Sequence, residues 1–383
     1  MSQDTLFPVE TDSQTIEPDL VLFMTKKFAF QALLEKAATV VPSRDIQPML
    51  RNFLVEAEQG QLRVTATDLE LSVVAVNELV VVEKPGTCVL PAKQMLSIVH
   101  EAEDGNITVE VEKGEAKITV GRASWNLRVA DSGEYPPLPA ESEIEFCMVD
   151  RPRFVATLSA VQYAASRDAL KPGYMMIDVN KEKMRAADGI RFQQMNAPGV
   201  PDMQIPIGAV GDLLKLLRAT EVPKIAIGQD EYQIVFKVGV DMFMAARMTA
   251  TFPNVDEVLL APVQLNDQEL TCVRSELVSA IRRTRITADE ETSAVVLAIS
   301  QDGVQVSAAD KYGSSSVESV DCEWKRADRK ASFNCNHLLE MLEHVESKNV
   351  TLKFGKDTAT HPSAVCIEGP DGARGVLHQL RVE

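Results

Sequence analysis

The sequence predicts an α+β fold made of three tandem repeats, each with two helices packed on antiparallel sheets. Two series of markers support this prediction. A strand ending in small residues is followed by an aspartate three times, at Asp68, Asp188 and Asp310, which lie 120 and 122 residues apart. A second strand begins 38, 36 and 39 residues after these aspartates, at Asn106, Lys224 and Asn349. Because both spacings recur, we infer that one structural unit is repeated along the chain.

Each repeat opens with a predicted helix, over residues 28–39, 152–167 and 275–286. In the second of these, Phe154, Leu158 and Val161 have the i, i+4, i+7 spacing of a helix that buries one face. Strands with alternating apolar residues follow, such as 62–67 and 303–308. A second helix is predicted after a proline or asparagine start signal, over residues 92–103, 207–220 and 335–347. Further strands, such as 125–129 and 232–237, close the unit.

Proline-rich joints separate the repeats. Residues 135–139 join the first repeat to the second, and Phe252-Pro253-Asn254 leads into the third. Pro136 and Pro253 lie 117 residues apart, which is again about one repeat length. We therefore predict domains over residues 20–140, 141–264 and 265–383, after a polar, acidic and flexible extension over residues 1–19.

Composition limits the cellular setting of the chain. No apolar run approaches the roughly 20 residues that a membrane span needs, so we expect no membrane partner. The six cysteines include no CxxC pair and no export signal is recognisable, which predicts reduced, packed thiols in a cytoplasmic protein.

Signatures of catalysis are missing from the sequence. There is no phosphate-binding GxxxxGK[ST] loop, no GxSxG nucleophile elbow and no HExxH zinc pair. His337 and His344 share a predicted helix, but they lack the cysteine or carboxylate partners of a zinc site. A single aspartate per repeat indicates a turn cap rather than a catalytic cluster. We predict no enzymatic activity and no cofactor.

Charge is distributed unevenly between the predicted helices and the rest of the chain. The six helices with their flanking residues together carry +3 while the whole chain carries −17, so the remainder carries −20; the ranges summed are 26–39, 92–104, 150–168, 207–220, 274–288 and 335–348. A basic helical surface attracts phosphates without reading sequence; the alternative is that these side chains only solvate helix faces. The candidate phosphate contacts placed by helix position are Arg151, Arg153, Arg167, Lys215, Arg218, Arg282, Arg283 and Arg285.

The order of several short motifs resembles the bacterial DNA polymerase III beta subunit (beta sliding clamp) family, as a divergent member. These motifs are Thr67-Asp68-Leu69-Glu70, Ala187-Asp188-Gly189-Ile190-Arg191, Phe252-Pro253, Phe333-Asn334 and Val376-Leu377-His378-Gln379-Leu380-Arg381-Val382. The resemblance covers about residues 21–383. It implies a head-to-tail homodimeric ring with a helical lining and a rim of sheets. Such a ring encircles duplex DNA, is placed there by a clamp loader and tethers the replicative polymerase.

The resemblance also implies site residues. The subunit contact would place Trp125 and Leu127 against Ile286 and Thr287, with core packing as the alternative for Trp125. Arg44 matches a DNA-contacting loop position. A partner-peptide pocket would comprise Gly189, Ile190, Arg191, Phe192, Pro253, Val258, Asn334, Val376, Leu377, Leu380 and Arg381. For Val376, Leu377 and Leu380 a core-strand role is an equal alternative.

Several positions of this implied pocket depart from the family pattern. Ile190 replaces a histidine, Lys171 an apolar residue, Glu257 a basic residue and His337 an aromatic one, and His378-Gln379 stands for a Met-Pro pair. These departures and the acidic extension motivate an alternative function, a clamp-like adaptor or competitor that binds replication proteins without being loaded on DNA. A DNA-processing hydrolase is a third hypothesis, which the missing catalytic signatures disfavour.

Overall fold

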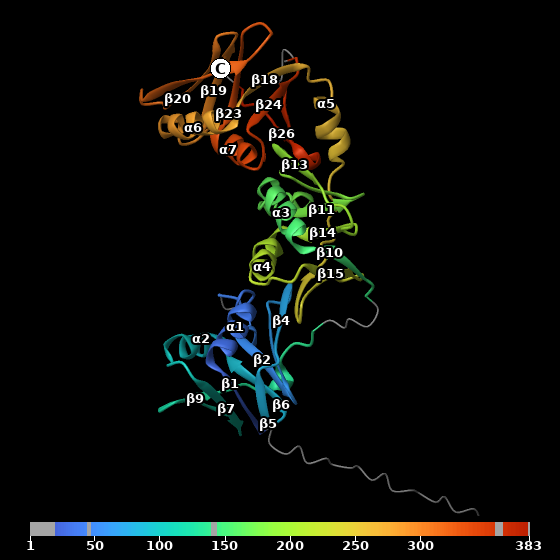
Figure 1. Ribbon diagram of the computed structural model, residues 1–383, viewed down its shortest axis with the longest axis vertical. Helices are drawn as coiled ribbons and strands as arrows, with labels where there is room; N and C mark the ends of the chain where they lie inside the picture. The colour runs from blue at the N-terminus through green and yellow to red at the C-terminus, as the bar shows by residue number, and fades with distance from the viewer. Residues whose placement is uncertain (1–19, 44–46, 139–143, 357–362, 382–383) are drawn as a thin grey trace, which may run out of the picture. The chain divides into compact units, whose positions relative to one another are not determined.

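The computed structural model describes residues 20–43, 47–138, 144–356 and 363–381 (Figure 1). The predicted extension over residues 1–19 and the predicted DNA contact Arg44 lie outside the described residues. The chain forms two compact units, Met1–Ala140 with Val240–Phe243, and Glu141–Gly239 with Met244–Glu383. The first unit holds the first predicted repeat, and the second unit holds nearly all of the other two.

The first repeat contains two helices among antiparallel strands. One sheet has the order β5-β1-β7-β8-β9, and a second run of strands has the order β4-β3-β2-β6. The two α-helices pack against each other. In chain order the elements are β1 (Val21–Lys26), α1 (Lys27–Ala38), η1 (Pro48–Arg51), β2 (Asn52–Glu58), β3 (Gln61–Thr67), β4 (Leu71–Asn77), β5 (Val80–Lys84), β6 (Gly86–Pro91), α2 (Ala92–Glu101), β7 (Asn106–Glu112), β8 (Glu115–Val120), β9 (Ala123–Arg128) and η2 (Ser132–Glu134).

The second repeat has a similar order of elements, with four strands between its two α-helices where the first repeat has five. Its strands β10, β15 and β16 pair side by side, and β14, β11, β12 and β13 form a second run. In chain order the elements are β10 (Phe146–Asp150), α3 (Arg151–Val161), η3 (Gln162–Ala164), η4 (Pro172–Tyr174), β11 (Met176–Asn180), β12 (Lys183–Ala187), β13 (Arg191–Asn196), β14 (Met203–Pro206), α4 (Ile207–Arg218), β15 (Lys224–Gln229), β16 (Gln233–Val238) and β17 (Asp241–Ala246).

The third repeat follows a connecting helix. Its four-stranded sheet has the order β21-β20-β19-β23. In chain order the elements are η5 (Asp256–Leu260), α5 (Ala261–Val263), β18 (Gln268–Val273), α6 (Arg274–Thr284), η6 (Arg285–Thr287), β19 (Ala294–Ser300), β20 (Gly303–Ala309), β21 (Ser315–Val320), β22 (Cys322–Glu323), β23 (Arg329–Asn334), α7 (Cys335–Glu343), β24 (Asn349–Phe354), β25 (Val365–Glu368), η7 (Pro370–Gly372) and β26 (Arg374–Leu377).

One nine-stranded sheet joins the second and third repeats within the second unit. Its order is β14-β11-β12-β13-β26-β25-β24-β18-β22, and the junction is the antiparallel pairing of β13 with β26, where Arg191 faces Leu377. Figure 1 shows these two strands side by side. Because strand pairing continues across the junction, the two repeats share a backbone hydrogen-bond network rather than a side-chain contact alone.

Local sequence explains why the helices begin where they do. Asp150 caps α3 by accepting a hydrogen bond from the backbone of Arg153, and Asn334 caps α7 by accepting from Asn336 and His337. The buried face of α3 consists of Phe154, Thr157, Leu158 and Val161, at the predicted spacing. Strands β7 and β19 alternate buried and less buried residues, as one-sided burial requires.

A basic residue at the start of each opening helix connects the two helices of its repeat. The first residue of each opening helix donates its backbone N–H to a carbonyl just before the strand that follows the second helix: Lys27 to Gly105, Arg151 to Pro223 and Arg274 to Lys348. The guanidinium of Arg151 also donates to the carbonyls of Leu217 and Val222, and that of Arg274 to Leu342 and Ser347. Lys27 instead pairs with Asp104, with 3.5 Å between Nζ and Oδ1. These contacts satisfy carbonyls at and beyond the end of the second helix.

Two predictions about helices need correction. The predicted helix 152–167 ends at Val161, and one turn of 3₁₀-helix follows over Gln162–Ala164. Ala165 is extended and Ser166 donates its backbone N–H to the carbonyl of Tyr174, so Arg167 lies in a loop rather than on the helix. The second correction concerns the joint after Pro253, which contains η5 and α5, where no helix was predicted. Val255, Leu259, Leu260 and Val263 bury one face of this connecting helix.

Candidate functional site

The repeated aspartates cap turns, as the sequence predicts. One carboxylate oxygen of Asp68 accepts from the backbone N–H groups of Glu70 and Leu71, that of Asp188 from Ile190 and Arg191, and that of Asp310 from Tyr312 and Ser314. Hydrogen bonds from Ser314 are the main reason that the pKa of Asp310 is lowered. Among the described residues, no group of three or more His, Cys, Asp or Glu side chains could hold a metal ion. These aspartates therefore have a structural role.

A hollow of about 540 Å³ lies at the junction of the second and third repeats, and we call it the junction hollow. It is formed by the end of α3 with η3, the loop 165–171, the turn before β13, and α7. Its lining residues are Ser159, Gln162, Tyr163, Ala165, Ser166, Arg167, Asp168, Lys171, Asp188, Ile190, Arg191, Glu340 and His344. It brings together side chains of both repeats.

Arg191 is the electrostatic centre of the junction hollow. Its Nε donates to Asp188 at 2.8 Å, and its Nη1 donates to Glu340 of α7. Its guanidinium lies over the ring of Tyr163, with 5.8 Å from Cζ to the ring centroid. The charge of Arg191 is thus shared by one carboxylate from each repeat, which links the repeats across the floor of the hollow.

Tyr163 adds an aromatic wall to the hollow. Its ring stacks on His344, with 4.7 Å between the ring centroids, and its hydroxyl donates to Gln193 at 2.9 Å. Burial raises the pKa of the Tyr163 hydroxyl, which therefore stays a hydrogen-bond donor. Sequence analysis missed Tyr163, Glu340 and His344 as pocket residues. Their sequence neighbourhoods resemble ordinary helix ends, so no local pattern identifies them.

The mouth of the hollow carries cations and apolar side chains together. Arg167 and Lys171 are exposed, and neither forms an ion pair with a described carboxylate. The Nζ of Lys171 donates only to the backbone carbonyl of Asp188, at 3.2 Å. Ile190 is 45% exposed in the lining, and Leu170, between the two cations in the loop, is 89% exposed. The two cations thus lie beside apolar side chains, while the lining as a whole holds three cations and three carboxylates: Arg167, Lys171 and Arg191 with Asp168, Asp188 and Glu340.

The predicted pocket residues have several different roles in the structure. Ile190 and Arg191 line the hollow, and Gly189 has a φ of +93°, which the turn after Asp188 requires. Phe192 and Val376 are buried in the core next to the connecting helix, and Leu377 is buried in the core of the third repeat. The core-strand alternative therefore describes Val376 and Leu377.

The other predicted pocket residues lie around this core. Val258, on η5, is 59% exposed, and Pro253 precedes that helix with its side chain half-buried. Asn334 is occupied as the cap of α7. Leu380 is half-buried and donates its backbone N–H to Ser332, while Arg381 is exposed.

Two histidines among the departures from the family pattern are partly buried. Burial and the charge of Arg191 lower the pKa of His337, and its Nδ1 is buried without a hydrogen-bond partner. Burial also lowers the pKa of His378, whose backbone N–H donates to the carbonyl of Ile190. Both side chains are thereby favoured in the neutral form.

The predicted DNA contacts divide into three groups. Arg151 is half-buried, and its guanidinium donates to the carbonyls of Leu217 and Val222 near the end of α4. Arg167 is a wall of the junction hollow and not a helix residue. The others are exposed on helices or, for Arg285, on the adjoining 3₁₀ turn: Arg153, Lys215, Arg218, Arg282, Arg283 and Arg285.

Some of these exposed cations have partners. Lys215 pairs with Asp212 at 2.8 Å, and Arg218 donates to the hydroxyl of Ser159 at 2.8 Å. Arg282 pairs with Glu343 at 2.7 Å, and Arg283 donates twice to Glu318. Exposed pairs of this kind are weak and exchange readily with other anions.

Two strands at sheet edges carry the predicted subunit contact. In the first repeat, β9 is the last strand of its sheet, and Trp125 and Leu127 are half-buried along a hollow of about 430 Å³ beside α2. In the third repeat, β21 is an edge strand in which Val317 is 65% exposed. The adjoining η6 exposes 80% of Ile286, while Thr287 shares a hydrogen bond with Ser316 of β21.

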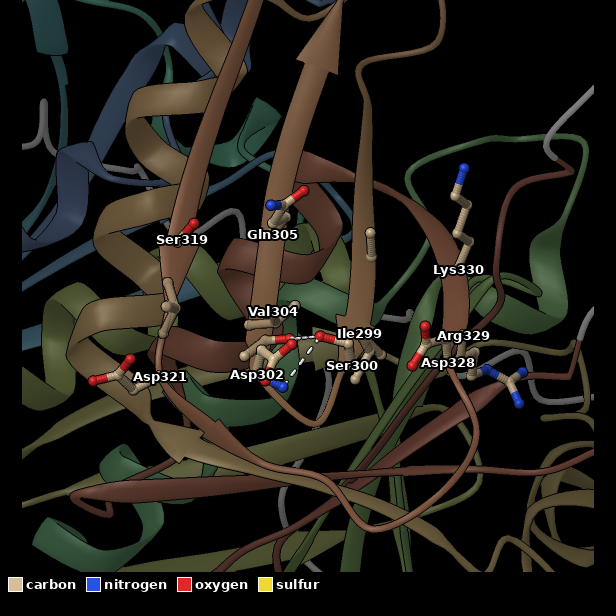
Figure 2. A pocket seen from close by; sticks show the side chains of 13 residues that line it. Ile299, Ser300, Asp302, Val304, Gln305, Ser319, Asp321, Asp328, Arg329 and Lys330 are labelled. Atoms are coloured by element: carbon tan, nitrogen blue, oxygen red, sulfur yellow. Dashed lines mark hydrogen bonds between the residues drawn. The ribbon is translucent and has the colours of Figure 1, made fainter.

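A further hollow lies at one end of the four-stranded sheet of the third repeat (Figure 2). Asp302, Asp321 and Asp328 come from different strand ends there and do not converge on one point. The turn is held locally, because Ser300 Oγ accepts from the backbone of Asp302 and donates to the carbonyl of Gly303. This hollow has the character of a polar strand end rather than of a site.

The cysteines form no disulfide bond. Cys88, Cys272, Cys335 and Cys366 are buried, and burial raises the pKa of the Cys88 thiol to about 12. Such thiols are poor nucleophiles and behave as packing residues. No helix among the described parts of the chain is long and apolar enough to cross a membrane.

The fold defines a class of protein, an α+β chain of three repeats. Each repeat has two helices that are connected by a basic residue at the start of the first helix. Two family models match it: the DNA polymerase III beta subunit N-terminal domain over residues 21–139, and the C-terminal domain of the same subunit over residues 263–369. Together these matches cover more than half of the sequence. The chain belongs to the DNA polymerase III beta subunit family.

Similar proteins agree with this assignment. The beta sliding clamp of Synechococcus elongatus is 25% identical over 343 residues, which are 85% of this chain and 90% of that protein. The Escherichia coli K12 beta sliding clamp is 24% identical over 331 residues, covering 83% and 89% respectively. The crystal structure of the Caulobacter crescentus beta sliding clamp superposes with a TM-score of 0.87 at 21% identity, over 95% of this chain and 100% of the other. A Bartonella birtlesii sliding clamp bound to griselimycin gives a TM-score of 0.86 at 24% identity, with the same coverage.

Proposed function

We propose that the protein is a DNA sliding clamp, a non-catalytic processivity factor of the cytoplasm that encircles duplex DNA and tethers a replicative polymerase. One observation carries the proposal. The order of elements recurs three times, and models of the same family match both ends of the chain. A clamp needs no active site, since its work is to keep the polymerase close to its template.

Binding to DNA would be electrostatic and independent of sequence. The exposed cations Arg153, Lys215, Arg218, Arg282, Arg283 and Arg285 lie on or next to the paired helices of the second and third repeats. The chain as a whole carries −17, so its surface elsewhere repels phosphates. Weak attraction of phosphates to one surface, combined with repulsion elsewhere, favours a protein that moves along DNA over one that binds tightly at one position.

Enclosure would require a second copy of the chain. The edge strand β9, with Trp125 and Leu127, offers a half-buried apolar strip, and β21 with η6 offers the exposed Val317 and Ile286. A head-to-tail contact between these two unlike edges would close into a ring of two subunits and cover both unpaired strands. We expect Trp125→Asp to give a monomer by solution mass and to leave the far-ultraviolet dichroism unchanged. A variant that remains dimeric would contradict this placement.

Partners would bind as short peptides with apolar anchors at the junction of the second and third repeats. The junction hollow, with its exposed Ile190 and its cations Arg167 and Lys171, supports this part of the proposal. The polymerase and the clamp loader are the partners we expect there. Their peptides would have to suit a site whose charges differ from the family pattern, with Lys171 in place of an apolar residue and Glu257 in place of a basic one.

Processive synthesis tests the proposed function. A polymerase and clamp loader from the same source should extend a primer on a long single-stranded circle to products many times longer when this protein is added. The Trp125→Asp variant serves as the matched control and should give no increase. If the products stay short while peptides still bind the hollow, the adaptor hypothesis would replace the clamp proposal.

A further inference from the structure

Two cysteines stand opposite each other in the third repeat. In the antiparallel pairing of β18 with β22, Cys272 faces Cys322 and Thr271 faces Glu323. Residues in direct cross-strand register have their Cα atoms about 4.5–5.5 Å apart and point to the same face of the sheet. A disulfide bond needs Cα atoms about 4.4–6.8 Å apart, so the backbone already meets this requirement.

Both side chains also belong to one hydrophobic core. Cys272 is buried within the core of the third repeat, and Cys322 is partly buried and packs against that core. The four other cysteines have different surroundings: Cys88 faces Val55, Cys147 faces Ile227, Cys366 faces Val376, and Cys335 begins α7. The fold therefore brings together Cys272 and Cys322 in particular.

We propose that Cys272 and Cys322 are a site of oxidative modification, at which hydrogen peroxide converts their two thiols into one disulfide bond. The Cys322 thiol is first oxidised to a sulfenic acid, while the peroxide is reduced and one water is released. The Cys272 sulfur then displaces the hydroxyl group of the sulfenic acid and the S–S bond forms. The displaced hydroxyl leaves as a second water with the proton of the Cys272 thiol.

A small oxidant can reach Cys322 through the polar hollow at the end of the four-stranded sheet. Ser300 and Asp321 line this hollow of about 510 Å³ (Figure 2). The Cys322 thiol donates to the carbonyl of Ser300 at 4.0 Å, and Asp321 precedes it in the chain. Cys272 is covered by the core, so oxidation begins at Cys322.

Both thiols are protonated at neutral pH. Burial, followed by the neighbouring Cys322, raises the pKa of the Cys272 thiol to about 12, and burial also raises the pKa of the Cys322 thiol. Because the thiolate is the reactive form, the pair stays reduced under ordinary conditions and is oxidised slowly by excess peroxide.

The bond connects the two sheets of the third repeat. Strand β21, at the edge of the four-stranded sheet, is joined to β22 by Asp321 alone, whereas β18 belongs to the nine-stranded sheet. Cys272 and Cys322 lie 50 residues apart in the chain, so the bond closes a long loop and restricts the unfolded chain. Oxidation therefore stabilises the third repeat.

Peptide mapping of the full chain tests the site. The Cys147→Ser variant lacks the exposed cysteine, which suppresses links between chains. It is treated with hydrogen peroxide, its remaining thiols are alkylated, and it is digested without reductant for mass spectrometry. We expect linked peptides that contain Cys272 and Cys322 as the main product, and a fall from five thiols to three in the denatured protein. Sulfinic acid at Cys322 without a link, or links from Cys322 to Cys335 or Cys366 in equal yield, overturns the proposal.

Thermal melting gives a second readout with its own control. The oxidised Cys147→Ser protein should melt about 5–10 °C above the reduced protein, and dithiothreitol should abolish this gain. Cys147→Ser/Cys322→Ser should gain nothing on oxidation, whereas the matched variant Cys147→Ser/Cys366→Ser should keep the gain. A gain without Cys322, or a linked protein that melts with the reduced one, overturns the proposal. Neither experiment uses DNA or a polymerase, so the result is independent of the proposed function.

Discussion

The helix pairs of the second and third repeats share one internal design and differ on their surfaces. In both, the first arginine of the opening helix, Arg151 or Arg274, donates to carbonyls at and beyond the end of the second helix. On the surface, the third repeat presents Arg282, Arg283 and Arg285 along one helix end, and two of these are paired with glutamates. Basic residues on equivalent helices therefore have two roles: some donate to backbone carbonyls within the repeat, and others are exposed charges. Composition alone does not distinguish the two.

The largest effect on stability should come from removing the arginine that connects the two helices of a repeat. Arg274→Ala removes two charge-assisted hydrogen bonds and leaves the carbonyls of Leu342 and Ser347 without these donors. We expect the free energy of unfolding to fall by about 2–3 kcal/mol, and Arg151→Ala to have a similar effect. Chemical denaturation measures both. Arg153→Ala, on the exposed face of α3, is the control and should change stability by no more than about 0.5 kcal/mol.

The surface charges should affect DNA binding and leave stability nearly unchanged. Replacing Arg282, Arg283 and Arg285 by alanine should reduce the slope of log affinity against log salt by up to about 3, roughly one for each lost phosphate contact. The matched triple variant of Arg153, Lys215 and Arg218 reports whether the second repeat contributes equally. An unchanged slope in both variants would mean that these helices do not face DNA.

A smaller difference between the two repeats concerns how the free energy of unfolding depends on pH. His337 lies two residues after the first residue of α7, where the second repeat has the buried Ala209. Because burial lowers the pKa of His337 below its ordinary value of about 6.5, the unfolded chain takes up a proton before the folded chain does. The free energy of unfolding should therefore decline as pH falls below about 6.5. His337→Gln should flatten this decline in denaturation curves.

The smallest effect should come from unpairing one surface arginine. Glu343→Gln removes the carboxylate that lies 2.7 Å from Arg282, in an exposed pair. Stability should change by less than about 1 kcal/mol, while DNA affinity at low salt should rise about two- to fivefold, because Arg282 becomes available and one negative charge is lost. Filter binding at two salt concentrations measures this. A fall in affinity would contradict the assignment of Arg282 to the DNA surface.

Repetition made much of the fold predictable. The paired spacings identified the order of elements, and Asp68, Asp188 and Asp310 cap turns as their position after a strand predicts. Helix ends were less predictable, because the break after Val161 depends on a tertiary hydrogen bond from Ser166 to Tyr174. The connecting helix was also missed, since its buried face packs on Phe192 and Val376 from distant strands.

The site was predictable only where it lies on a motif. Ile190 and Arg191, which belong to the predicted pocket, follow the Asp188 turn and line the junction hollow. Glu340, Tyr163 and His344 come from other helix ends and meet there only because β13 pairs with β26. Arg151 and Arg167 show the converse limit, because both were assigned to one helix, whereas Arg151 donates to carbonyls near the end of α4 and Arg167 lines the junction hollow from a loop.

Linearisation of DNA beneath the bound protein tests the central claim most directly. The protein is loaded onto a nicked circular duplex, unbound protein is removed, and the circle is then cut once at a distant site. Enclosure predicts that the protein stays on the intact circle through a wash at moderate salt and leaves within minutes of cutting, by sliding off the ends. Retention on the linear DNA, or loss from the uncut circle, would contradict enclosure and with it the proposal of a sliding clamp.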